Sequence, residues 1–208
     1  MVDPTAQRAE MVDRLRQRGI TDERVLAAMG TVPRERFVPA DQAAAAYEER
    51  PLPLGDGQTI SVPQIVAIMA AALELRDHDR VLEVGAGAGY AAAVLSRCAG
   101  RVITVERHRG LADRARAALA ELGYDNVEVR HGDGALGAPD EAPFDAISVA
   151  AMAADLPAAL IDQLAPHGRL ICPVGGHRVG NLVLLHRGRR QVMHAVAFVP
   201  LITDTDPT

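Results

Sequence analysis

The chain has 208 residues, of which 49% are hydrophobic and 24% charged, and its net charge is −5. This length is enough for one domain with a sizeable core, and the composition is that of an ordinary globular protein. The lack of a basic block excludes general nucleic-acid binding, and an aromatic content of 3% leaves few residues for base stacking. No stretch is long and apolar enough to span a bilayer and the N-terminus is charged, so we expect no membrane contact and a cytoplasmic location.

The two cysteines and seven histidines show no spacing that is typical of metal or redox sites. Cys98 and Cys172 are far apart in the sequence, and each is expected to be a small buried apolar residue. The histidines are expected to be structural or to lie on the surface. We therefore predict no metal site.

Two helices are predicted at the start of the chain. Residues 5–18 place Met11, Val12 and Leu15 on one side among charged residues, as in a short amphipathic helix. Thr21 is expected to cap the second helix, because two acidic residues follow it and favour the positive end of the helix dipole.

Prolines and glycines mark the next part of the chain. Pro33 and Pro39 delimit an ordered loop, and a short alanine-rich helix is expected over residues 41–47. Residues 51–63 fit no regular element. They could form a linker, but their leucines and isoleucines and their lack of lysine favour a loop that packs on the core and contacts a substrate.

A helix is predicted after Pro63, because proline is favourable in a first turn and apolar residues follow at helical spacing. Thr59 and Ser61 lie at the mouth of this helix, where hydroxyl and N–H groups can receive an anion. Ser61 could equally serve only to cap the helix. The sequence by itself favours neither interpretation.

The stretch Val81–Tyr90, with the sequence VLEVGAGAGY, combines a buried strand, a glycine-rich loop and the start of a helix. Three glycines at alternate positions let a ligand approach the backbone closely. The dinucleotide fingerprint requires a small residue where Tyr90 stands. Glu83 would repel a phosphate, so the loop suits a cationic or zwitterionic ligand. A glycine-rich turn without a ligand is the alternative, and we interpret the loop as a cofactor site.

Strands and helices alternate from residue 80 onward, which predicts a parallel sheet with helices on both faces. The last part of the chain is typical of an antiparallel hairpin that closes the sheet. The strands are expected at residues 80–83, 102–106, 127–130, 146–149, 169–173, 181–187 and 191–199, and the helices at about 90–97, 111–122 and 156–164.

Three acids lie at the ends of three successive predicted strands: Glu83 and Glu106 close the first two, and Asp133 follows the third. In an open α/β sheet, ligands bind beyond the carboxyl ends of the strands, near the switch in strand order. Glu106 could accept both hydroxyls of a ribose, and Asp133 could contact an adenine edge. Any one of these acids could be a helix cap, but three of them beside a glycine loop indicate a cofactor site. The arginines at 107, 109, 114 and 116 are expected to form a solvated helix face.

Two further elements accompany the glycine loop: VPRERFVP over residues 32–39 and GQTIS over residues 57–61. Together they resemble the protein-L-isoaspartate (D-aspartate) O-methyltransferase family, and the loop resembles motif I of the class I S-adenosylmethionine-dependent methyltransferases. The similarity extends from about residue 9 to residue 202, and other matching stretches include RGI at 18–20, PLPLG at 51–55, GDG at 132–134, APFDAI at 142–147 and FVPL at 198–201.

The resemblance implies a class I methyltransferase fold, which is a Rossmann-like, mostly parallel α/β sheet with a C-terminal antiparallel hairpin and an N-terminal helical extension. Residues 1–208 would form a single domain, with the helices and substrate loop in 1–78 and the cofactor-binding sheet in 79–202. The partners would be isoaspartyl-containing peptides and proteins, and the chain would act as a monomer.

The implied reaction is methyl transfer from S-adenosylmethionine to the α-carboxylate of an L-isoaspartyl residue, with S-adenosylhomocysteine as product. The ester then collapses to a succinimide, whose hydrolysis restores some normal aspartate. A carboxylate with a pKa of about 4 is already ionised, so no general base is required. By motif, the catalytic residues would be Ser61 and Thr59, and the cofactor-binding residues would be Ile60, Glu83, Gly85, Ala86, Gly87, Gly89, Glu106, Arg107, Asp133 and Gly134.

Other functions remain open at this point. A related enzyme could methylate the ordinary aspartate of one dedicated peptide, or an inactive relative could bind the cofactor as an interaction module. The intact Thr59–Ser61 loop argues against the inactive relative, and Tyr90 ranks a dehydrogenase last. The chain departs from the family pattern at Val62, Gln64, Ala86, Ala88, Ala150, Asn181 and Ala197.

Overall fold

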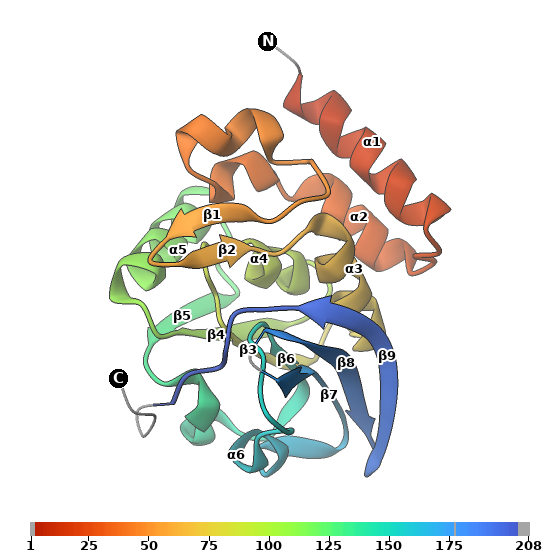
Figure 1. Cartoon of the computed structure of the whole chain (residues 1–208), viewed down its shortest axis with the longest axis vertical. Coiled ribbons are helices and arrows are strands. Elements are labelled where there is room, and N and C mark those ends of the chain that lie inside the picture. Colours follow the sequence, from red (N-terminus) through yellow and green to blue (C-terminus); the bar gives the residue numbers. More distant parts are fainter. Residues whose placement is uncertain (1–2, 177, 204–208) are drawn as a thin grey trace.

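The computed structural model describes residues 3–176 and 178–203. A seven-stranded sheet with the order β5-β4-β3-β6-β7-β8-β9 forms its centre, and β1 and β2 form a separate two-stranded sheet (Figure 1). The strands are β1 (Leu52–Gly55), β2 (Gln58–Ile60), β3 (Arg80–Val84), β4 (Arg101–Glu106), β5 (Val127–His131), β6 (Phe144–Val149), β7 (Leu164–Gly176), β8 (Val179–His186) and β9 (Arg189–Ala197).

The helices in this part of the chain comprise α-helices and short 3₁₀ helices. The α-helices are α1 (Pro4–Gln17), α2 (Glu23–Thr31), α3 (Pro63–Ala72), α4 (Tyr90–Ser96), α5 (Arg109–Glu121) and α6 (Ala158–Ile161). The 3₁₀ helices are η1 (Arg34–Phe37), η2 (Ala40–Ala45), η3 (Gly134–Leu136) and η4 (Pro139–Glu141).

The sheet is parallel from β5 to β7, and β8 and β9 continue it as an antiparallel hairpin. The middle strand of the parallel part is β3, in which Leu82 lies opposite Ile103 of β4 and Ile147 of β6. All three side chains are buried, as expected for parallel strands that are covered on both faces. The predicted mixed α/β fold with an N-terminal helical extension is therefore confirmed.

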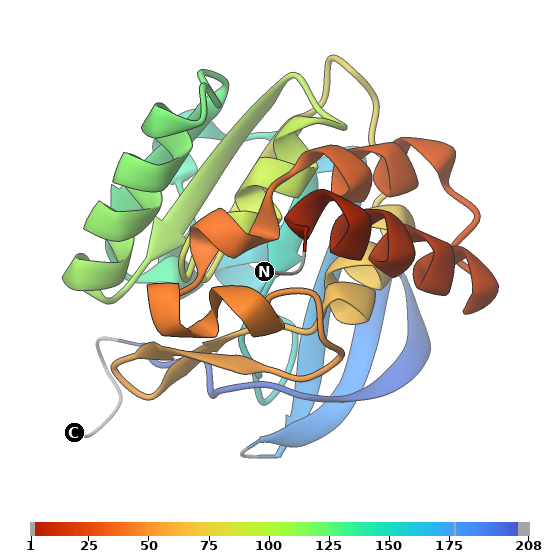
Figure 2. The same ribbon diagram turned by 90° about the horizontal axis from the view of Figure 1, so that it is seen from above.

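Helices cover the two faces of the sheet unequally. One core cluster joins a sheet face to α3, α4 and α5 and continues into α1 and α2. The other face packs against α6 and the segments around it in a smaller cluster. Figure 2 shows α1 and α2 outside the layer that α3 and α4 form. The N-terminal helices therefore cover α3 and α4. Of these two helices, α4 follows the glycine loop and α3 follows the segment that contains Ser61.

The prediction that residues 51–63 hold no regular element is wrong, because β1 and β2 pair there as an antiparallel hairpin. Asp56 and Gly57, which lie between the two strands, both adopt positive φ angles (51° and 68°). An Asp-Gly pair with positive φ at both residues is the signature of a tight hairpin turn. The sequence contained that signal, but the nearby prolines obscured it. Leu52, Leu54 and Ile60 of this hairpin are buried.

Other predicted boundaries also change. Asp22, not Thr21, caps α2, since its side chain accepts the N–H groups of Arg24 and Val25. The expected loop between Pro33 and Pro39 contains the 3₁₀ helix η1, and the alanine-rich helix is the 3₁₀ helix η2. The sixth α-helix is shorter than predicted, because β7 already begins at Leu164.

Candidate active site

The glycine loop turns sharply between β3 and α4. Gly85, Gly87 and Gly89 have φ angles of 92°, 55° and 93°, a region that residues with a side chain rarely adopt. The Gly85 N–H donates to the Val105 carbonyl at 2.8 Å, which ties the loop to β4. A Cβ atom on Gly87 would lie 3.4 Å from Leu54 of the hairpin. The loop therefore offers bare backbone on the side that faces β1.

Glu106 ends β4 and is 5% exposed. Its Oε2 accepts the Gly87 N–H at 2.8 Å, and its Oε1 accepts the His108 N–H at 2.9 Å. An ionised carboxylate has further lone pairs, so both oxygens can still accept hydroxyl groups from a ligand. The backbone thus fixes Glu106 beside the glycine loop without using its full acceptor capacity.

A pocket with an empty volume of about 910 Å³, which opens to solvent, lies beyond the carboxyl ends of β3, β4 and β6. This is the place where the chain leaves the β3–β4–β5 half of the sheet for β6 on the other side of β3. The pocket brings together most of the predicted site residues. They are Thr59, Ile60, Ser61, Gly85, Ala86, Gly87, Glu106, Arg107 and Gly134.

Thr59, Ile60 and Ser61 form one wall of the pocket at the end of β2. Ser61 is half-buried, and Thr59 is exposed. The N-cap residue of α3 is Val62, and no side chain makes a capping hydrogen bond there. The interpretation in which Ser61 only caps the helix is therefore wrong, and its position in the pocket wall supports a role toward a ligand.

Glu83 lies in β3, just before the glycine loop, and is not among the residues that line the pocket. Its side chain is 1% exposed, and its Oε2 accepts the Thr104 hydroxyl at 2.5 Å. Its Oε1 has no hydrogen-bond partner among the residues described. Burial raises the pKa of Glu83 to about 8, against the opposing effect of the Thr104 hydrogen bond, and the charge of Glu106 adds to the rise. Its role in holding a cofactor stays a prediction.

Gly89 and Asp133 also lie outside the pocket lining. Gly89 is the N-cap of α4, where a Cβ atom would lie 3.1 Å from Leu119 of α5. The Asp133 carboxylate accepts the Ala135 N–H at 2.9 Å and so caps η3. Both residues shape the segments beside the pocket, and their direct contact with a cofactor stays a prediction.

Gly134, the residue after Asp133, has a steric reason to be glycine. A Cβ atom at this position would lie 2.5 Å from the Val84 side chain. The segment after β5 therefore packs directly onto the end of β3, the strand that leads into the glycine loop. This close approach brings the third strand end to the edge of the pocket.

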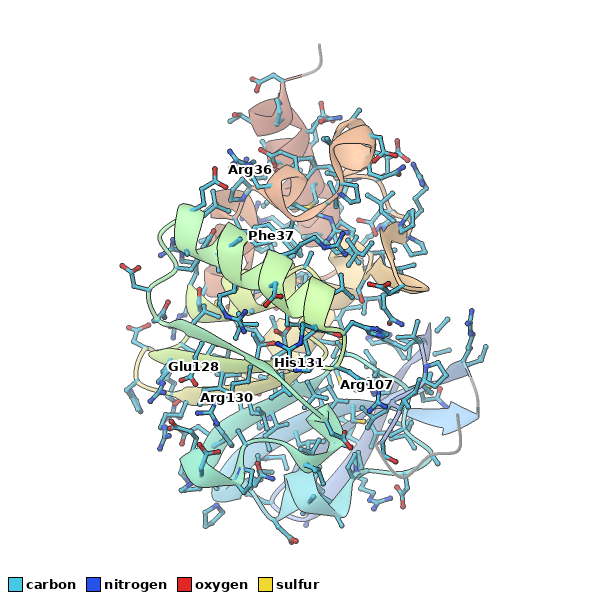
Figure 3. All side chains as sticks on the ribbon, turned by 90° about the vertical axis from the view of Figure 1, so that its left-hand side faces the viewer. Arg36, Phe37, Arg107, Glu128, Arg130 and His131 are labelled. Carbon is cyan, nitrogen blue, oxygen red and sulfur yellow. The ribbon has the colours of Figure 1, made fainter. Side chains whose placement is uncertain are left out.

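Arg107 follows Glu106 and lines the same pocket. Figure 3 shows Arg107 and His131 toward one end of β4 and β5, and Glu128 and Arg130 toward the other. Glu128 and Arg130 form an ion pair at 2.7 Å. Arg107 was expected on a solvated helix face with the arginines at 109, 114 and 116, but it lines the pocket.

Several residues that line or support the pocket were not predicted from the sequence. The C-terminal stretch Val199–Ile202 lines the pocket, and the main chain of Met152 bonds to Val199 and Leu201 at 2.7 Å each. Arg114 donates to the Leu54 carbonyl at 2.6 Å and holds the hairpin against α5. The FVPL stretch was the available signal, but a sequence does not show where a segment after the last strand returns.

Ala150 and Ala151, which follow β6, line the pocket as well.

The described residues contain no group of three or more His, Cys, Asp and Glu side chains that could hold a metal ion. None of the helices in residues 3–176 and 178–203 combines the length and the apolar character that a membrane span needs.

Comparison with known proteins identifies the family. The model of the family protein-L-isoaspartate (D-aspartate) O-methyltransferase (PCMT) matches residues 6–206. The chain belongs to this family. A protein-L-isoaspartate O-methyltransferase of Methanoculleus marisnigri is 52% identical over 201 residues, which are 94% of this chain and 91% of that protein. The resemblance seen in the sequence is thereby confirmed.

Solved structures give the same result. A protein-L-isoaspartate O-methyltransferase superposes with a TM-score of 0.83 and 29% identity. The match covers 93% of this chain and 65% of that one. This chain therefore spans just under two thirds of the length of the solved protein. A Plasmodium falciparum protein in complex with S-adenosyl-L-homocysteine has a TM-score of 0.79 and 25% identity, with coverage of 94% and 98%.

Proposed function

We propose that this chain transfers a methyl group from S-adenosylmethionine to the α-carboxylate of L-isoaspartyl residues in damaged proteins and so initiates their repair through a succinimide. The observation that carries the proposal is the presence of Ser61 and the glycine loop in the walls of one pocket. Membership of the PCMT family supports it. A donor loop and an acceptor loop that share one pocket suit direct transfer between two bound substrates.

The pocket fits S-adenosylmethionine. The positive φ angles of Gly85 and Gly87 leave bare backbone in the wall. Glu106 offers acceptors to two ribose hydroxyls beside that backbone. We propose that the residues named from the family motifs, together with Val105 and His108, hold the cofactor.

When bound, S-adenosylmethionine supplies an electrophilic methyl group on a sulfonium. The walls around such a centre are mostly apolar, since Val84, Ala86 and Ala150 line the pocket with Leu54 and Leu201. An apolar enclosure keeps water away from the reacting atoms. The apolar residues are thus proposed to protect the transfer from hydrolysis.

The protein's own contribution is alignment of the carboxylate. The substrate carboxylate is already ionised at neutral pH, so it needs no proton acceptor. The Ser61 hydroxyl is proposed to donate to one carboxylate oxygen and leave the other free to attack in line, with Thr59 in the same wall. Holding two reactants in a near-attack geometry can supply roughly 7–11 kcal/mol of the barrier.

Three further features belong to this proposal. The chain is proposed to act as a monomer, as the family resemblance implies. It is proposed to be a single domain, because one core cluster joins α1 and α2 to the helices on the sheet. The proposed location is the cytoplasm, where damaged proteins would be accessible to it.

The test uses labelled S-adenosylmethionine and two peptides that differ only in an isoaspartyl or an aspartyl linkage. We expect label to enter the isoaspartyl peptide as a base-labile ester and the aspartyl peptide far less. Equal labelling of both would favour a general carboxyl methyltransferase. No labelling of either, with S-adenosylmethionine bound, would contradict the proposed activity.

A further inference from the structure

Arg34, in η1, is the largest fully buried side chain of the region described and carries a formal charge into the core. Its accessible surface is 0%, and it lies outside the pocket lining. Burying a charge is costly unless polar groups compensate it. The partners of this guanidinium therefore show what the charge does.

Two of its partners are main-chain carbonyls from separate segments. Nε donates to the Ala46 carbonyl at 2.7 Å, and Nη2 donates to the Ser61 carbonyl at 2.7 Å. The third partner is an aromatic ring, since the guanidinium carbon lies 4.6 Å from the centre of the Tyr90 ring. Arg34 thus joins the residue after η2, the end of the substrate loop and the first residue of α4.

No carboxylate forms a direct ion pair with Arg34 among the residues described, although the Glu49 charge favours the cation. Nη1 has no hydrogen-bond partner there either. Burial lowers the pKa of Arg34 from its usual value, against the raising effect of Tyr90 and Glu49, but an arginine remains charged under ordinary conditions. The cation therefore depends on the Ala46 and Ser61 carbonyls and on the Tyr90 ring, so displacing any of them would leave a buried charge poorly compensated.

Tyr90 is itself held firmly. Its side chain is 1% exposed, Phe37 from the same 3₁₀ helix packs against it edge-on at 5.9 Å, and it lines the pocket next to the glycine loop. Ser61, by contrast, lies between a two-stranded hairpin and the start of α3, where few backbone bonds fix it. The connection through Arg34 therefore positions Ser61 relative to Tyr90, and not the reverse.

We propose that Arg34 is a positioning residue for methyl transfer: it fixes the Ser61 main chain against Tyr90 so that the substrate loop and the cofactor loop keep a constant separation. The inference rests on the proposed function of Ser61. Because a displacement of about 1 Å can cost 100-fold in rate, loss of this contact should affect the transfer step more than cofactor binding.

The test compares Arg34→Met with Arg14→Met. Arg14 is a matched control, since its Nη2 donates to the Tyr47 carbonyl at 2.8 Å and supports the same N-terminal layer without contact to Ser61 or Tyr90. For each variant we would measure the thermal midpoint, the Kd for S-adenosylmethionine, and kcat and KM for an isoaspartyl peptide.

In Arg34→Met we expect kcat to fall about 10- to 100-fold and KM for the peptide to rise, while the Kd for S-adenosylmethionine changes less than about threefold. Arg14→Met should lower the thermal midpoint and leave kcat and KM within about twofold of the wild type. Equal kinetic effects in both variants, or unchanged kcat and KM in Arg34→Met, would overturn the proposal.

Arg34→Lys provides the second variant in case Arg34→Met does not fold. Lysine keeps the charge but lacks the planar fork that reaches two carbonyls and stacks on a ring. We expect kcat/KM about fivefold or more below the wild type and above that of any folded Arg34→Met. Wild-type kinetics in Arg34→Lys would overturn the proposal, whereas an inactive wild-type chain would contradict the proposed function and this inference with it.

Discussion

The two sides of the pocket are built in different ways. On the proposed cofactor side, Glu106 ends β4, and Gly85–Gly89 and Gly134 follow the two strands beside it, so the strand register brings them together. On the proposed substrate side, the loop around Ser61 and the stretch Val199–Ile202 come from segments far apart in the chain. Single long-range contacts hold that side in place, such as those of Arg34 and Arg114 to main-chain carbonyls.

This difference predicts which properties can be changed separately. A parallel sheet that is buried on both faces resists local adjustment, so the cofactor side should change only at the cost of stability. A hairpin held by a few side-chain contacts can shift without unfolding the sheet. Substitutions on the substrate side should therefore alter turnover, and substitutions on the cofactor side should alter affinity or folding.

The largest effect is expected on the substrate side. Ser61→Ala should lower kcat for an isoaspartyl peptide by about 100-fold, as is typical when one donor to a reacting oxygen is removed. Its Kd for S-adenosylmethionine should stay near that of the wild type, because Ser61 is proposed to contact the substrate carboxylate and not the cofactor. Steady-state kinetics and calorimetry would measure the two quantities. A loss of cofactor affinity as large as the loss of kcat would remove the distinction between the two sides.

Glu106→Ala tests the cofactor side. We expect S-adenosylmethionine binding to weaken by about 1.5–3 kcal/mol, the usual contribution of hydrogen bonds to a charged group. The Gly87 N–H would also lose its acceptor at 2.8 Å, so the glycine loop itself should loosen. Calorimetry would measure the affinity, and Glu106→Gln, which keeps an acceptor oxygen, should lose less. Unchanged affinity in both variants would exclude Glu106 from the site.

Gly87→Ala tests whether the backbone of the loop carries the cofactor side. A side chain at φ 55° should cost about 1–2 kcal/mol of unfolding free energy, and the added carbon would approach Leu54 at 3.4 Å. Gly110→Ala is the control, because Gly110 lies in α5 with open space around it, and alanine there should be neutral or slightly stabilising. Denaturant unfolding would compare them, and equal stability of the two variants would contradict the argument.

The same difference explains what the sequence could predict. The loop after β3 and the strand ends carrying Glu106 and Asp133 depend on local patterns, and periodicity locates them to within a few residues. The roles of Arg34, Arg114 and Val199–Ile202 depend on contacts between segments far apart in the chain. A local pattern such as VPRERFVP or FVPL can mark such a segment, but it does not show which other segment it contacts. The hairpin β1–β2 lies between these cases, since Asp56-Gly57 specified its turn while Pro51 and Pro53 suggested irregular backbone.

Glu83 should make stability depend on pH. Its folded-state pKa is raised from 4.5 to about 8, so its contribution to stability is fully present below pH 4.5 and is lost as the pH rises toward 8. The unfolding free energy of the wild type should therefore decline across this window relative to that of Glu83→Gln, which cannot ionise and can still accept from Thr104. Denaturant unfolding at several pH values would measure this, and parallel pH profiles of the two proteins would show that Glu83 is not the cause.

The smallest effect is expected for the histidines nearest the pocket. His108 lines the pocket, but the contact that it makes to Glu106 uses its backbone N–H, which a substitution leaves in place. His131 is exposed at the end of β5. An ionised carboxylate nucleophile needs no proton acceptor, so neither imidazole has a proton to remove.

His108→Gln and His131→Gln should therefore keep kcat within about tenfold of the wild type, well short of the 10²–10⁴-fold loss of a general base. The pH profile of kcat/KM should likewise show no requirement for a neutral imidazole near pH 6.5. A loss of more than about a thousandfold in either variant, with cofactor binding intact, would mean that the nucleophile arrives protonated. Alignment by the substrate side would then not be sufficient for catalysis, and a different class of acceptor would have to be sought.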